Sequence, residues 1–273
     1  MEFRHVLITR FNIYYKTKMA QQGYDPEEWL QERFLIFQKF CFPSVLNQSK
    51  KDFTWLIYVD SETTPEILES LQKLVKPYSF ILLIKREFQN FSLKLVINED
   101  IYKYFGKGFQ YLISSRVDTD DMLHRDFIKS VQDRFEGQTY KALNFNKGQI
   151  YDVKTGVISN AIHKQNPFIS LIEKRSKDGF KTVFYKIHSL FKDDPLKIEI
   201  KNNVPMWCMS VHGINVSTGF FGKINIFFDP SLKEPFGFEF QKKPTIIDKF
   251  RFLIRSFSKT TNKVYEKLNT IFN

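Results

Sequence analysis

Residues 1–120 alternate continuously apolar runs with stretches of helical periodicity. The runs are HVLITRF, FTWLIYVD, YSFILLIKR and FQYLISSRVD, which begin at residues 5, 53, 78 and 109. Runs that are apolar at nearly every position predict strands buried on both faces, as in parallel sheets that are covered by helices. The alternation therefore predicts an α/β fold with a mostly parallel central sheet flanked by helices.

Helical periodicity is clearest in three segments that lie between these runs. After Pro26, residues 27–42 carry aromatic residues at spacings of three and four, and Pro43 is expected to break or kink this helix. Residues 64–75 begin with Thr-Pro and an early Glu, which is typical of a helix start. Residues 91–105 are also expected to be helical, whereas the polar stretch after the first strand is expected to be a loop.

The second half of the chain has shorter apolar runs separated by Gly, Pro and Asn. We expect these runs to be strands and loops that complete one domain over residues 1–240. Residues 241–273 are expected to form a separate basic tail, because eight Lys or Arg against two acids give it +6 of the net charge of +11. Its apolar residues recur at spacings of three, four and seven, which predicts an amphipathic helix. They are Ile246, Ile247, Phe250, Leu253, Ile254, Phe257, Val264, Leu268 and Ile271.

A basic amphipathic helix can lie in a membrane interface, with its apolar side among the acyl chains and its cations near anionic headgroups. We therefore expect residues 244–273 to contact an anionic membrane peripherally. The alternative is a final helix that packs on the catalytic domain or on a second subunit, which would make a homodimer.

The sequence argues against several classes of protein. No stretch of 18 uncharged apolar residues is present, which argues against a polytopic membrane protein. The N-terminus lacks the pattern of a secretion signal, so a cytoplasmic location is expected. Cys41 and Cys208 have no metal-binding spacing and fit buried, reduced thiols. No nucleic-acid-binding motif is found, and we expect no nucleic-acid partner.

An acidic cluster, Asp118-Thr119-Asp120-Asp121, follows the fourth predicted strand. Open α/β sheets bind their ligands at the carboxyl ends of strands. Three adjacent carboxylates repel one another and need a compensating cation, and oxygen ligands suit Mg²⁺ or Mn²⁺ that holds a diphosphate. The alternative is an Asp-rich turn or helix cap, since Asp residues stabilise helix N-termini.

The order of several segments adds a family resemblance. HVLITRFN, FTWLIYVDSETTPE, SSRVDTDDML, NPFISLIE and PMWCMSVHGINVS occur in sequence between residues 5 and 217. This set resembles the rhamnosyltransferase family of bacterial surface-polysaccharide loci, which belongs with GT-A-type glycosyltransferases. The resemblance implies a GT-A-like nucleotide-diphospho-sugar transferase fold. It also implies transfer of a sugar, rhamnose by the family's name, from a dTDP- or UDP-sugar to a capsule, lipopolysaccharide or lipid-linked glycan acceptor, with Mn²⁺ or Mg²⁺ as cofactor.

The resemblance also implies roles for individual residues. The DXD motif and a downstream histidine would hold the metal, and further residues at the strand ends would hold the donor. The implied metal ligands are Asp118, Asp120 and His212. The implied donor contacts are Thr9, Arg10, Asn12, Asp60, Arg116, Asp118 and Asp121.

An inverting transferase needs a base near the acceptor hydroxyl. Glu173 is the first candidate, followed by Asp152 and Asp178, while a retaining mechanism would need no base in that role. Two rival functions stay open from the sequence. One is a nucleotidyltransferase or another metal-dependent phosphoryl enzyme, although no phosphate-binding glycine loop is present. The other is a non-catalytic, membrane-associated binding protein.

Overall fold

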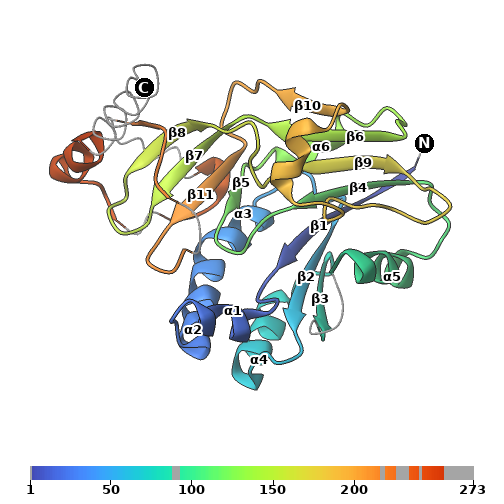
Figure 1. Cartoon of the computed structure of the whole chain (residues 1–273), viewed down its shortest axis with the longest axis horizontal. Coiled ribbons are helices and arrows are strands. Elements are labelled where there is room, and N and C mark those ends of the chain that lie inside the picture. Colours follow the sequence, from blue (N-terminus) through green and yellow to red (C-terminus); the bar gives the residue numbers. More distant parts are fainter. Residues whose placement is uncertain (1, 88–92, 216–218, 226–233, 240–241, 255–273) are drawn as a thin grey trace, which may run out of the picture.

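The computed structural model describes residues 2–87, 93–215, 219–225, 234–239 and 242–254 (Figure 1). Two sheets form the body of the protein. The larger sheet has seven strands in the order β10-β6-β9-β4-β1-β2-β3. Its strands are β1 (Phe3–Arg10), β2 (Thr54–Asp60), β3 (Ile81–Arg86), β4 (Tyr111–Arg116), β6 (Tyr140–Phe145), β9 (Ser170–Lys174) and β10 (Lys197–Ile200).

Strands β3, β2, β1 and β4 are all parallel, and their residues are the four apolar runs of the sequence. Strand β9 is antiparallel to both of its neighbours, β4 and β6, and β10 is parallel to β6. Six strands therefore run in one direction and β9 runs in the other. The prediction of an α/β fold with a mostly parallel central sheet is confirmed.

Helices cover both faces of this sheet, because alternate residues of β1 pack in two different core clusters. Leu7 belongs to a core cluster that also includes side chains of several helices, whereas Val6 and Ile8 belong to a second cluster with another helix. The helices on the Leu7 side are α1 (Tyr15–Gln21), α2 (Pro26–Ile36), α3 (Phe42–Leu46), α4 (Pro65–Val75) and α6 (Phe127–Gln132). The helix on the other side is α5 (Leu93–Phe105).

Pro43 does not end the helix that was predicted over residues 27–42. A π-helical turn, Phe37–Cys41, joins α2 directly to α3, where Pro43 occupies one of the first positions. Proline is tolerated there because the first backbone N–H groups of a helix have no partner within it. The prediction of a loop after β1 is wrong in part, because Tyr15–Gln21 form the short helix α1, anchored by the buried side chains of Tyr15 and Met19.

The second sheet has five strands in the order β12-β8-β7-β11-β5. They are β5 (Met122–Leu123), β7 (Lys147–Asp152), β8 (Ile158–Ile162), β11 (Trp207–Val211) and β12 (Lys223–Ile224). Trp207 is fully buried and stacks on Phe168 with 5.2 Å between ring centroids. Gly148 makes room for it, because a Cβ at that position would lie 2.1 Å from the Trp207 ring.

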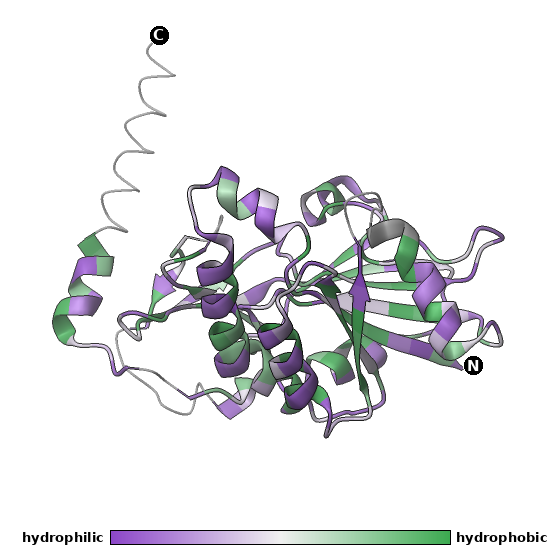
Figure 2. Cartoon of the chain, turned by 90° about the horizontal axis from the view of Figure 1, so that it is seen from below, coloured by the Kyte–Doolittle hydropathy of each residue, from purple (hydrophilic) through white to green (hydrophobic). Residues whose placement is uncertain are grey.

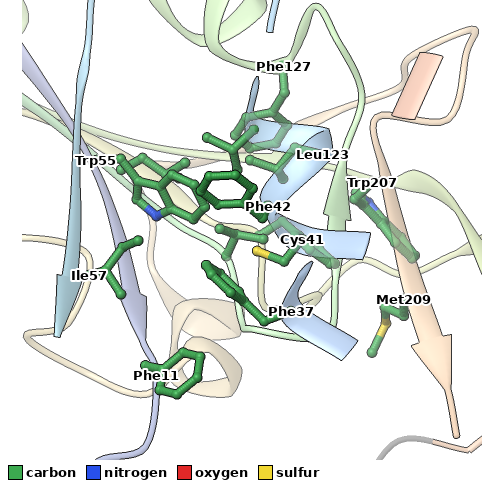
Figure 3. Close-up of a cluster of buried hydrophobic side chains, with 14 of the residues drawn as sticks. Phe11, Phe37, Cys41, Phe42, Trp55, Ile57, Leu123, Phe127, Trp207 and Met209 are labelled. Carbon is green, nitrogen blue, oxygen red and sulfur yellow. The ribbon is translucent and has the colours of Figure 1, made fainter. Parts of the chain in front are cut away.

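The helical segment α2-π-α3 lies between the two sheets (Figure 3). Phe37, Cys41 and Phe42 from this segment pack in one cluster with Trp55 of β2 and Trp207 of β11. One core therefore holds the end of β11 in a fixed position relative to β1, β2 and β4.

Residues 246–254 form a helix at the edge of the molecule, shown in red in Figure 1. This segment is the beginning of the predicted tail helix, and residues 255–273 lie outside the described residues. Among the helices that the structure describes, none is long and apolar enough to cross a membrane.

Candidate functional site

Three adjacent parallel strands bring predicted site residues to one edge of the larger sheet. Strands β1, β2 and β4 end at Arg10, Asp60 and Arg116, and β1 lies between the other two. The segment Val117–Asp121 follows β4 at this edge. Strand β11 reaches the same place from the second sheet, because the backbone N–H of Ser210 donates to Asp121 at 3.3 Å.

Two arginines engage Asp118. Arg116 donates from one nitrogen to both carboxylate oxygens of Asp118 at 3.2 Å, and Arg10 lies 3.6 Å from one of them. Both guanidinium groups also lie over the ring of Phe184, 5.2 Å from its centroid for Arg10 and 5.0 Å for Arg116. Burial alone would raise the pKa of Asp118, but the charges of Arg116 and Arg10 outweigh it and hold that pKa below its usual range.

Asp120 is engaged by a third arginine and by two residues that follow β11. Arg33 of α2 donates to its two oxygens at 2.8 and 3.0 Å. The Nε2 of His212 lies 3.1 Å from one of these oxygens, and Asn215 donates to the same oxygen at 3.3 Å. Burial opposes ionisation of Asp120, but Arg33 and His212 lower its pKa below the ordinary value.

Asp121 is the third carboxyl group of the cluster, and no arginine pairs with it among the described residues. Burial and the neighbouring charges of Asp120 and Asp118 raise its pKa well above the ordinary value. Its expected contact with a donor sugar stays a prediction.

The cations that compensate this acidic cluster therefore come from the chain itself. From the sequence, a metal ion is expected for this purpose, because only the three carboxylates are adjacent in the chain. Arg10, Arg33 and Arg116 supply three positive charges in direct contact with Asp118 and Asp120. A metal ion is therefore not needed to offset the repulsion, and the metal roles of Asp118, Asp120 and His212 stay predictions.

The donor atoms around Asp120 nevertheless fit a divalent cation. Within the ranges that the structure describes, no three His, Cys, Asp or Glu side chains gather as a metal site. Asp120 and His212 offer an oxygen and a nitrogen in contact, and the Nδ1 of His212 is buried with no hydrogen-bond partner among the described residues. Mg²⁺ is usually held by one or two carboxylates together with substrate phosphates. Asp120 fits that pattern, and the imidazole of His212 would add a nitrogen ligand.

Thr9 and Asn12, which are predicted to contact the donor, make hydrogen bonds within the protein. Thr9 is fully buried, donates to the carbonyl of Val117 at 2.9 Å and accepts from Trp55. Asn12 donates to Thr63 and accepts from the backbone N–H of Asp60. These bonds hold the segments after β1, β2 and β4 in place, so Thr9 and Asn12 position the site.

Asp60 also caps a loop. Its two carboxylate oxygens accept from the backbone N–H groups of Tyr14 at 3.1 Å and Glu62 at 3.0 Å. This arrangement is the loop-capping alternative to a contact with the donor, and the donor contact stays a prediction.

The candidate bases do not lie in this group. Glu173 is level with Leu112 near the start of β4, and its oxygens accept from the backbone N–H groups of Lys181 and Thr182 at 2.8 Å. Burial raises its pKa to about 7. Asp152 caps the turn between β7 and β8 through Thr155, and Asp178 lies exposed in another turn. The structure therefore gives Glu173 a structural role and lends no support to its predicted role as base.

Sequence reasoning missed four residues of the site. Arg33 is the one cation among the aromatic residues that recur along its predicted helix. This position is the signal that could have indicated a role in the site. Asn215 and Phe184 had no such signal. His188 lies in the 3₁₀ turn His188–Asp193. Burial lowers its pKa, and the charges of Arg116 and Asp118 also influence that pKa.

The family is now identifiable. A family model described as "Putative rhamnosyl transferase" matches residues 4–224, which is most of the chain and includes every arginine and aspartate of the site. The chain belongs to this family. Its members are glycosyltransferases, so the predicted enzyme class is confirmed. No curated protein matches the chain.

Solved structures show distant likenesses to this family member. TarS 1-349 of S. aureus in complex with UDP-GlcNAc has 10% identity and a TM-score of 0.39, and the match covers 79% of this chain and 60% of that one. The mannosyltransferase PcManGT from Pyrobaculum calidifontis, in complex with GDP-Man and Mn²⁺, has 10% identity and a TM-score of 0.33, and the match covers 59% of this chain and 44% of that one. The matched region therefore spans less than two thirds of either relative, and likenesses at these TM-scores carry no conclusion about activity.

Proposed function

We propose that this protein transfers a sugar from a nucleotide diphosphate donor to a cell-surface glycan, with the diphosphate bound where β1, β2 and β4 end. The observation that supports the proposal is the convergence of Arg10, Arg33 and Arg116 at that edge. Arginine forks pair with phosphate oxygens through two parallel hydrogen bonds. A diphosphate leaving group needs such cations because it accumulates negative charge as its bond to the anomeric carbon of the sugar breaks.

Arg116 has the geometry best suited to binding the diphosphate. Its side chain is 6% exposed, and its Nε–H is buried with no partner among the described residues. A buried donor without an acceptor is costly, so a site of this kind favours an anionic ligand that accepts from it. Arg10 lies beside Arg116 with its side chain 43% exposed and contributes a second cation that solvent and ligand can reach.

A divalent cation, Mn²⁺ or Mg²⁺, would be held by Asp120 and His212. When bound, it would neutralise charge on the departing diphosphate. Rhamnose as the sugar rests on the family description, and UDP or dTDP as the nucleotide rests on the same resemblance. The acceptor, a capsule, lipopolysaccharide or lipid-linked glycan, is proposed on that ground too.

A membrane contact would suit a lipid-linked acceptor. Ile246, Ile247, Phe250 and Ile254 are 84, 65, 62 and 55% exposed and belong to one described helix. Lys242, Lys243, Lys249 and Arg251 lie on or next to this helix. Figure 2 shows the helix at the margin of the molecule. Exposed apolar side chains among cations complement an anionic lipid surface, and we infer that this helix contacts one.

The donor can be identified with a panel of nucleotide sugars. The purified chain is incubated with UDP-, dTDP- and GDP-sugars and Mn²⁺, and both the melting temperature and the release of nucleoside diphosphate are measured. At least one nucleotide sugar should raise the melting temperature and release its diphosphate. Release of pyrophosphate from a nucleoside triphosphate and a sugar phosphate would instead indicate the nucleotidyltransferase alternative. Binding of no nucleotide at all would contradict the proposal.

A further inference from the structure

Arg33 and Asp120 form a closed pair at the centre of the candidate site. The guanidinium donates to both carboxylate oxygens, and the two side chains are only 13 and 10% exposed. A further hydrogen bond from the Nε of Arg33 reaches Thr119, and its guanidinium carbon lies 5.4 Å from the ring centroid of Trp29. Arg33 is thus fixed in place by three neighbours.

The same two oxygens of Asp120 are those that a divalent cation would use. A guanidinium bound across both oxygens occupies the side of the carboxylate from which a cation approaches. We propose that Arg33 is an internal counter-cation that competes with the divalent ion for Asp120, so that the ion binds only when Arg33 releases this carboxylate. The proposal rests on the metal component of the proposed function and on no particular sugar or nucleotide.

Burial makes this competition strong. Removing one partner of a buried ion pair leaves an uncompensated charge, which is far more costly than losing an exposed pair. An Asp120 carboxylate that has lost Arg33 keeps only His212 and Asn215 as side-chain partners among the described residues, so its charge attracts any available cation. In the protein without nucleotide, Arg33 supplies that cation, and the affinity for a divalent ion should be low.

A nucleotide diphosphate would change the balance in two ways. Its phosphate oxygens add ligands for the divalent ion, and its negative charge offers the released guanidinium a new partner. Metal and nucleotide should therefore bind with positive coupling, each raising the affinity of the protein for the other.

The test is Mn²⁺ binding to the nucleotide-free protein, followed through the electron paramagnetic resonance signal of free Mn²⁺. Arg33→Gln should bind Mn²⁺ at least about tenfold more tightly than the wild type, because Asp120 loses its internal partner. The matched control is Arg134→Gln, which removes an arginine whose side chain, among the described residues, donates to the carbonyl of Ser130 and packs on Phe145. This control should leave Mn²⁺ affinity at the wild-type value.

Two results would overturn the proposal. One is equal Mn²⁺ affinity in the wild type and Arg33→Gln, including the absence of binding to both. The other is tight binding by Arg33→Gln that persists after Asp120→Asn is added, since the ion would then lie elsewhere.

A wild-type measurement covers the case in which Arg33→Gln does not fold. In protein labelled with ¹⁵N-arginine, the Nε–H resonance of Arg33, assigned with Arg33→Lys, should move when Mg²⁺ and UDP are added together. A resonance that keeps its position at saturating Mg²⁺ and UDP would show that Arg33 never leaves Asp120. Because the Mn²⁺ titration uses no nucleotide, its failure is distinguishable from failure of the donor panel.

Discussion

Arg116, the last residue of β4, donates to both carboxylate oxygens of Asp118, two residues further along the chain, at 3.2 Å. This local pair sets the direction of the guanidinium and leaves its Nε–H free of any partner among the described residues. The acid of the DXD motif thereby orients an arginine, in addition to any contact that it makes with a ligand.

Arg116→Lys should weaken binding of the nucleoside diphosphate by about tenfold or more, because lysine keeps the charge but lacks the planar fork and the Nε–H donor. Isothermal titration with UDP and dTDP measures the change. Arg134→Lys, at a partly buried arginine outside the site, is the matched control and should bind as the wild type does. Equal affinities for Arg116→Lys and the wild type would remove Arg116 from the diphosphate site.

Asp120→Asn should both abolish sugar transfer and destabilise the fold. From the sequence alone, the three adjacent carboxylates repel one another, so the loss of one of them would be expected to stabilise the fold. The structure predicts the opposite, because the substitution leaves Arg33 buried without its ionic partner, at a cost of about 3 kcal/mol in the free energy of unfolding. Urea denaturation and release of nucleoside diphosphate measure the two effects.

The control for Asp120→Asn is Asp133→Asn, which removes a carboxylate from an exposed pair with Lys129. Exposed pairs contribute little to folding, so stability and turnover should stay close to the wild-type values. An Asp120→Asn protein as stable as this control would show that the pair with Arg33 contributes little to folding.

Glu173 should impose a pH dependence on stability. Burial raises its folded-state pKa to about 7, above its ordinary value of 4.5. Between these two pH values the unfolded chain loses this proton while the folded protein keeps it. Stability from this group is therefore present below pH 4.5 and is lost as the pH rises towards 7, by up to about 3 kcal/mol.

Glu173→Gln removes this titration. The difference in unfolding free energy between the wild type and the variant, measured by urea denaturation from pH 4 to pH 8, should shift in favour of the variant as the pH rises. A difference that stays constant over this range would mean that Glu173 titrates normally. Retained sugar transfer in Glu173→Gln would also agree with the structural role of this residue, and loss of transfer in a folded variant would restore its candidacy as the base.

The central strands were predictable because burial on both faces forces continuous apolar runs. The runs that contain Leu7, Trp55 and Leu112 are apolar at nearly every position, which predicts buried parallel strands. Neighbouring parallel strands end at the same edge of a sheet. The strand pattern thus agrees with the grouping of Arg10, Asp60 and Arg116 that the family resemblance implies.

The pairing of side chains at that edge was not predictable in the same way. Arg33 meets Asp120 although 87 residues separate them in the chain, because α2 packs in the same core as β2 and β11. Likewise, Glu173 lies beside Lys174 in the sequence, and its burial depends on the pairing of β9 with both β4 and β6. Contacts of this kind depend on tertiary geometry that local patterns do not encode.

The exposed apolar side chains of helix 246–254 should determine membrane binding. Replacing Ile247, Phe250 and Ile254 together by serine removes apolar surface that contacts little else, so the fold and the release of nucleoside diphosphate should be unchanged. Binding to liposomes that contain anionic phospholipid, measured by cosedimentation at low salt, should fall by about tenfold or more, given roughly 25 cal/mol for each Å² of apolar surface. Ile162→Ser, at an exposed isoleucine of β8, is the matched control and should bind liposomes as the wild type does.

Removing residues 244–273 should have the same effect on liposome binding and still leave an active enzyme. Added salt should weaken the binding of the wild type, because each Lys or Arg near an anionic surface contributes on the order of 1 kcal/mol that ions screen. If the full-length protein ignores anionic liposomes at low salt, the membrane contact is wrong. A change from dimer to monomer in the triple serine variant, observed by analytical ultracentrifugation, would then assign the apolar face to contact with a second copy of the chain.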